Sequence, residues 1–90
     1  MIEKLLAAND GKHKWIAYFT NGRKVKFGAK GYTDYTIGKD KERRERYRER
    51  HEKDLATLDP YKPGYLSYYI LWGDSTSLDT NIKKYNQKFF

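Results

Sequence analysis

Residues 14–27 read KWIAYFTNGRKVKF, and this stretch decides the fold. Asn21-Gly22 lies between two runs in which apolar and polar residues alternate, which is the strongest short-range signal of an antiparallel β-hairpin. The runs predict strands over residues 12–20 and 23–28. A further strand is predicted over residues 2–7, although that segment suits a helix equally well. We therefore expect an amino-terminal hairpin or three-stranded meander.

The rest of the chain is predicted to be helical. Residues 39–56 contain good helix formers without glycine or proline, and Asp40 is placed to cap this helix at its start. Two shorter helices are predicted over residues 64–72 and 77–88. The last one has an apolar stripe at helical spacing, formed by Leu78, Ile82, Tyr85 and Phe89. The pattern indicates one α+β domain over residues 1–90, with the sheet first and about three α-helices after it.

The amino-acid composition excludes several classes of protein. The chain has no cysteine, so neither disulfides nor thiolate metal ligands can stabilise it. Aromatic residues make up 17% of the chain, which is typical of a chain that folds although 34% of it is charged. No apolar run is long enough to span a bilayer, and the amino-terminus lacks the features of a signal peptide. We expect no membrane partner, no secretion and no cofactor.

The net charge of +7 is unevenly distributed. Residues 1–30 carry seven lysines and arginines against two acidic residues, which accounts for most of the excess. The predicted helix over residues 39–56 looks highly charged, but oppositely charged residues stand four apart in it. The pairs are Glu42–Arg46, Arg48–Glu52, Glu49–Lys53 and Arg50–Asp54. Such pairs predict a solvated helix that largely neutralises itself, so the positive potential is expected on the hairpin.

A two-residue loop at Asn21-Gly22 would set which residues share a face of the hairpin. One face would then hold Ile16, Tyr18, Val25 and Phe27 as the core. The other would hold Trp15, Ala17, Phe19, Lys24 and Lys26, a mixture typical of surfaces that stack bases and hold phosphates. Two alternatives stay open: helices could cover both faces, or a bulged turn could shift the register and reassign the faces.

These features favour a non-enzymatic module that binds nucleic acid, with DNA favoured over RNA. The candidate phosphate-binding residues are Lys12, Lys14, Arg23, Lys24, Lys26 and Lys30, and the candidate stacking residues are Trp15 and Phe19. The alternative is a structural or protein-interaction component whose many tyrosines form an interface, including one that would make a homo-oligomer.

Catalytic and metal-binding patterns are weak. His13 and His51 are too few and too far apart in the sequence for a spacing-defined zinc site, and no phosphate-binding loop is present. A small nuclease could be built from Asp34, Tyr35, an arginine and His51, but these residue types occur by chance in any chain this polar. We expect no catalytic centre and no metal site, and we expect Asp34 to tie its loop together as a hydrogen-bond acceptor.

The chain resembles a family of small uncharacterised proteins of large eukaryotic DNA viruses of the marseillevirus, mimivirus and algal-virus types. The resemblance covers about residues 13–89, and the hairpin lysines are not part of it. It is carried by Phe27-Gly28, Gly31-Tyr32-Thr33-Asp34-Tyr35-Thr36, Lys39 to Tyr47, Arg50-His51, Asp59-Pro60, Pro63 to Ser67, Tyr69 to Gly73, Ser75 to Leu78, Asn81-Ile82, Tyr85 and Phe89. It implies a viral source and a location in the virion or in the host cytoplasm or nucleus, and it implies no activity.

Overall fold

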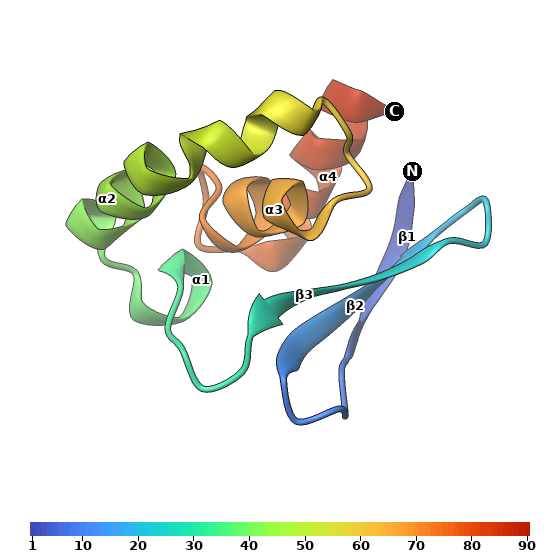
Figure 1. Cartoon of the computed structure of the whole chain (residues 1–90), viewed down its shortest axis with the longest axis horizontal. Helices are drawn as coiled ribbons and strands as arrows, with labels where there is room; N and C mark the ends of the chain where they lie inside the picture. Colours follow the sequence, from blue (N-terminus) through green and yellow to red (C-terminus); the bar gives the residue numbers. More distant parts are fainter.

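The computed structural model describes residues 1–90 as an antiparallel sheet with helices packed on one of its faces (Figure 1). The strands are β1 (Ile2–Ala7), β2 (His13–Phe19) and β3 (Lys24–Ala29), in the order β1-β2-β3. The predicted three-stranded meander is therefore confirmed, and residues 2–7 form a strand and not a helix.

The helical part begins with a short helix, α1 (Tyr35–Gly38), that was not predicted. The predicted long helix is an α-helix, α2 (Lys41–His51), continued by a 3-10 helix, η1 (Glu52–Thr57). The predicted second helix is a single α-turn, α3 (Pro63–Leu66), followed by a π-helical turn, η2 (Ser67–Leu71). The last helix is α4 (Leu78–Phe89), so the α+β class and the order of its parts are confirmed.

The helix starts follow from side-chain caps. The carboxylate of Asp40 accepts hydrogen bonds from the main-chain N–H groups of Glu42 and Arg43, as predicted. Ser77 caps α4 in the same manner by accepting from Thr80 N. These bonds satisfy amide groups that have no partner within the first turn of a helix.

The predicted hairpin register is wrong by one residue. The loop has three residues, because Phe19 N donates to Arg23 O over 2.9 Å and Gly22 N donates back to Phe19 O over 3.0 Å. Gly22 has a φ of 89°, which completes a turn of this type with a left-handed residue and a bulge. Trp15 therefore opposes Phe27, and Ala17 opposes Val25.

The shifted register exchanges the two faces of β2, since side chains alternate along a strand, whereas Val25 and Phe27 of β3 face the core as predicted. Ala17, Phe19 and Phe27 point toward the helices and are at most 3% exposed. Ile16 and Tyr18, which the two-residue loop would have placed in the core, lie on the opposite face with Lys24 and Lys26. The open alternative of a bulged turn is the one that the structure adopts.

The core lies between the inward sheet face and the carboxy-terminal helices. Besides the strand residues it contains Tyr65, Leu66, Ile70, Leu71, Trp72 and Tyr85. All four residues of the predicted α4 stripe are buried in it or packed against it. Gly73 permits a close approach here, because a Cβ at this position would lie 2.1 Å from the carbonyl oxygen of Tyr69.

Two asparagines of α4 connect distant parts of the chain. Asn81 is 1% exposed, and its amide group donates to Ile70 O and Ser75 O. Asn86 accepts from Ile2 N over 2.7 Å and donates to Ile2 O over 3.0 Å, so it pairs with the free edge of β1. These bonds fasten the last helix to η2 and to the start of the sheet.

Candidate functional site

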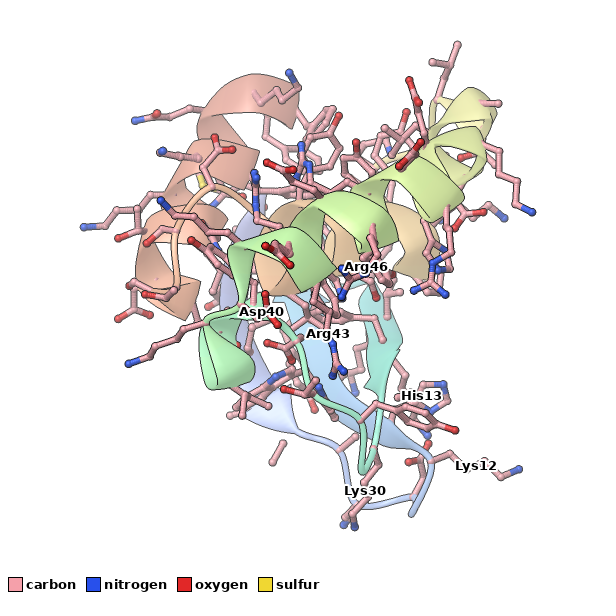
Figure 2. All side chains as sticks on the ribbon, turned by 90° about the vertical axis from the view of Figure 1, so that its left-hand side faces the viewer. Lys12, His13, Lys30, Asp40, Arg43 and Arg46 are labelled. Carbon is pink, nitrogen blue, oxygen red and sulfur yellow. The ribbon has the colours of Figure 1, made fainter.

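The basic residues predicted to bind phosphate do not form one patch. Lys12 and Lys30 lie together at one end of the sheet (Figure 2), where Lys30 N donates to Lys12 O. Arg23 lies at the hairpin turn with its guanidinium 3.9 Å from the centre of the Tyr61 ring. Lys24 and Lys26 point outward from the sheet. The expectation of a single positive ribbon is therefore wrong.

Two of the predicted lysines are engaged by carboxylates. Lys14 Nζ lies 2.5 Å from Asp34 Oδ2, and these side chains are 12% and 1% exposed. Lys26 Nζ lies 3.5 Å from Asp10 Oδ2 in a more exposed pair. Lys14 is thus a structural residue that joins β2 to the start of α1.

Asp34 ties its loop together, as expected. Its second carboxylate oxygen accepts hydrogen bonds from Thr36 N over 2.8 Å and from Thr36 Oγ1 over 2.5 Å. The carboxylate is buried, and each of its partners is an N–H or O–H donor, which stabilises its negative charge. The same carboxylate pairs with Lys14 and caps α1, so the two interactions fix each other's position.

The two aromatic residues predicted to stack on bases point into the core. Phe19 is 3% exposed and lies against Tyr61 and Phe90, with ring centres 4.6 and 5.9 Å away. Trp15 is half-buried and packs against the same core. Neither ring is presented to solvent together with the hairpin lysines. The register shift is the cause, and it brings Tyr18 to the outward face instead.

The arginines of α2 fall into two groups. The side chains of the first group form hydrogen bonds with other parts of the chain. Arg44 donates to Gly73 O over 2.6 Å and to the Asp74 carboxylate over 2.8 Å. Arg48 donates to the carbonyl oxygens of Trp72 and Tyr68 over 2.7 and 3.3 Å. The predicted self-pairing along the helix is therefore largely wrong: of the expected pairs only Arg46–Glu42 is present, at 4.0 Å between exposed atoms.

The second group faces a groove. Arg43, Arg46 and Arg50 are exposed and stand at i, i+3 and i+7, so they share one side of α2. Figure 2 shows Arg43 and Arg46 extending from α2 toward the sheet. All three line a hollow of about 830 Å³ between α2 and the segment that runs from the end of β3 to α1. Arg43 and Arg50 make no ion pair.

The remaining walls of the groove set its charge and shape. Tyr32, 73% exposed, lines it opposite α2, and the Lys14–Asp34 pair also lines it. Lys14 and Asp34 neutralise each other, which leaves three arginines against one carboxylate, that of Glu49. The groove is therefore positively charged, with an exposed aromatic ring on one side. A site of this kind binds anions that carry a flat ring or a chain of phosphates.

A stack of three rings supports one side of the groove. The Tyr47 ring lies between Trp72 and His51, with centres 4.4 and 4.1 Å away and planes tilted by 9° and 22°. Burial raises the pKa of Tyr47, although its hydrogen bond with Ser67 opposes that shift. His51 Nδ1 lies 3.0 Å from Asp54 Oδ2. The stack fixes α2 against η2 and thereby fixes the arginine wall.

Asp34 and His51, which the sequence offered for a small nuclease, are bound to other partners. Asp34 bonds Lys14 and Thr36, and His51 bonds Asp54, so no hydrogen bond joins Asp34 to His51. No group of three or more His, Cys, Asp or Glu side chains is placed to hold a metal ion. None of the helices is both long enough and apolar enough to cross a membrane.

Fold and groove together define a small basic α+β protein with an arginine-lined groove beside its first long helix. Comparison with protein families identifies it further: a family model described as a family of unknown function (DUF5754) matches residues 4–51, and the chain belongs to this family. The matched segment runs from β1 to the end of α2, so it contains the three groove arginines and Tyr32. Neither the search of curated proteins nor the search of solved structures found a match.

Proposed function

We propose that this protein binds nucleic acid and that a strand lies in the groove beside α2. The observation that carries the proposal is the row of three exposed arginines, Arg43, Arg46 and Arg50, two of them without any ion pair. Guanidinium groups bind phosphate oxygens through paired N–H donors and stay charged at any physiological pH. A row of them along one wall suits an anion that is itself extended.

The dimensions of the row agree with a short stretch of strand. Seven residues of helix separate Arg43 from Arg50, which corresponds to roughly 10 Å along the helix axis. A row of this length can contact a few successive phosphates of one strand. Tyr32 is placed to stack on a base while the arginines hold the phosphates.

A single strand suits the groove better than a duplex. The exposed surface of α2 outside the groove carries Glu42 and Glu45, which would repel the second strand of a duplex docked along the helix. A single strand can place its phosphates against α2 and turn a base toward Tyr32. Given the resemblance to proteins of large DNA viruses, we favour DNA over RNA as the partner and a role on viral DNA without catalysis.

Fluorescence anisotropy tests this proposal. A labelled single-stranded oligonucleotide is titrated with protein at several salt concentrations, and the logarithm of affinity is plotted against the logarithm of salt. Three neutralised phosphates on a single strand give a slope of about −2. A slope near zero, or no change in anisotropy at low salt, contradicts the proposal.

A protein partner is the second candidate function. Ile37 is 61% exposed and Leu58 is 83% exposed, so both apolar side chains are accessible to a partner. Such residues suit an interface in a virion or between copies of the chain. Light scattering across a range of protein concentrations tests for self-association, and a constant monomer mass contradicts the homo-oligomer.

A further inference from the structure

We infer that the outward face of the sheet is a second nucleic-acid-binding surface, so that one molecule holds two strand segments at once. The ligand, a nucleic-acid strand, rests on the proposed function, but this surface consists of residues that do not line the groove. It is formed by Lys4, Leu6, Ile16, Tyr18, Lys24 and Lys26, here called the outer face.

The centre of the outer face is an aromatic ring between two cations. Tyr18 lies on β2, the middle strand, while Lys4 lies on β1 and Lys24 on β3. The Lys4 and Lys24 ammonium groups are 5.3 and 5.5 Å from the centre of the Tyr18 ring. Sheets that bind single strands have this arrangement, with aromatic rings on the strands to stack bases and basic groups around them for phosphates.

No helix lies over the centre of the outer face. All the helices lie on the opposite side of the sheet (Figure 1). The face nevertheless bears apolar groups, since Leu6 is 45% exposed and Ile16 and Tyr18 are half-buried. Solvated sheet faces are usually polar, so an uncovered apolar strip indicates a partner.

Charge decides which partner fits. The cations of the outer face are met by one carboxylate only, that of Asp10, 3.5 Å from Lys26 at the end of the sheet. A second copy of the chain would bring lysines against lysines, which is unfavourable across an interface. A polyanion that offers flat rings satisfies both the lysines and Tyr18, and a nucleic-acid strand is such a partner.

The groove and the outer face consist of different residues, so both can bind a strand at the same time. The groove lies between α2 and the segment that follows β3, and none of the six residues of the outer face lines it. A strand in the groove therefore leaves the outer face open. Binding at two places links segments of one nucleic acid, or two molecules of it, without any contact between protein copies.

A capture experiment tests this inference. One biotinylated single-stranded oligonucleotide is fixed to beads, the full-length protein is added, and a second, non-complementary fluorescent oligonucleotide is supplied. We expect the wild-type protein to retain the second oligonucleotide. Lys4→Glu/Lys24→Glu should reduce this retention at least tenfold while the protein still binds one oligonucleotide in solution. Both lysines are exposed, so folding should not change, which circular dichroism verifies.

The control is Lys62→Glu/Lys83→Glu, which makes the same change in charge at exposed sites that belong to neither surface. Equal retention by the outer-face variant and this control overturns the inference, as does failure of the wild-type protein to retain a second oligonucleotide when it binds the first. Failure of the proposed function looks different: changing the groove arginines would then leave binding of a single oligonucleotide unaltered.

Discussion

The guanidinium group of Arg48 donates a hydrogen bond of 2.7 Å to the main-chain oxygen of Trp72 and lies 4.1 Å from the centre of the Tyr68 ring. A side chain that looks like part of a nucleic-acid-binding helix is thus used to fasten that helix to η2. Arg43, Arg46 and Arg50 lie on another side of α2 and face the groove instead. The division of α2 into a fastening side and a groove side is the basis of the predictions that follow.

Arg48→Ala should lower the free energy of unfolding by about 2 kcal/mol, because two largely buried carbonyl groups lose their charged donor. Arg46→Ala, on the groove side, should change it by less than about 0.5 kcal/mol. Arg48→Lys should not restore stability, since an ammonium group cannot reproduce the planar fork of donors. Urea denaturation compares the three variants, and equal stability of Arg48→Ala and Arg46→Ala contradicts the division.

The Lys14–Asp34 pair should behave as a unit. Asp34→Asn leaves the Lys14 ammonium group, 12% exposed, without its counter-charge, and we expect a loss of about 3 kcal/mol. Adding Lys14→Met should recover more than half of this loss, because a flexible apolar side chain replaces the unpaired charge. A double variant no more stable than Asp34→Asn alone, measured by thermal denaturation, contradicts this account of the pair.

Leu58→Gly should stabilise the protein. Leu58 has a φ of 51° at the end of η1 and is 83% exposed, so it bears the cost of a left-handed conformation without being buried. Removing the Cβ relieves about 1 kcal/mol, partly offset by the greater freedom of glycine in the unfolded chain. Leu58→Ala is the matched control, since it shortens the side chain but keeps the Cβ. Melting temperatures should rank the glycine variant above the alanine variant, and the reverse order refutes the explanation.

Asp10 should make stability depend on acidity. The hydrogen bond with the His13 side chain, together with the main-chain N–H groups of His13 and Lys12, holds the pKa of the Asp10 carboxyl group far below its ordinary value. A depressed pKa in the folded state contributes stability that is present above the ordinary pKa of the carboxyl group and is lost as pH falls toward the depressed one.

Asp10→Asn should therefore be less stable than the wild-type protein at pH 6, and the difference should shrink by pH 3. Urea denaturation at both values measures it. A difference that stays constant or grows on acidification contradicts the predicted linkage.

Local patterns predicted the elements of the fold well and their register poorly. Asn21-Gly22 marks the position of the hairpin turn, but this dipeptide suits both a two-residue loop and a three-residue loop with a bulge. The alternation of apolar and polar residues does not distinguish between these two loops. Since one residue of slip reverses the faces of β2, an error of one position put Trp15 and Phe19 on the predicted surface, whereas Phe19 lies in the core and Trp15 packs against it.

The partners of the α2 arginines could not be predicted from the sequence of the helix alone. Spacing along a helix reveals neighbours four residues away, and it predicted pairs such as Arg48–Glu52. It cannot reveal acceptors in another part of the chain, and Arg44 and Arg48 find theirs at Gly73 and Trp72. The i, i+3, i+7 spacing of Arg43, Arg46 and Arg50 was a usable signal of a shared side, but only the fold shows that Tyr32 stands across a groove from it.

The most direct test of the central claim replaces the groove arginines together. Arg43→Ala/Arg46→Ala/Arg50→Ala keeps good helix formers in α2, and Lys62→Ala/Lys83→Ala/Lys88→Ala removes the same charge from exposed positions that do not line the groove. Affinity for a single-stranded DNA oligonucleotide is measured by anisotropy across a salt series for both variants. We predict that the groove variant loses the salt dependence contributed by about three phosphate contacts and binds at least tenfold more weakly than the control. Equal affinities and equal slopes for the two variants would contradict the claim that a strand lies in this groove.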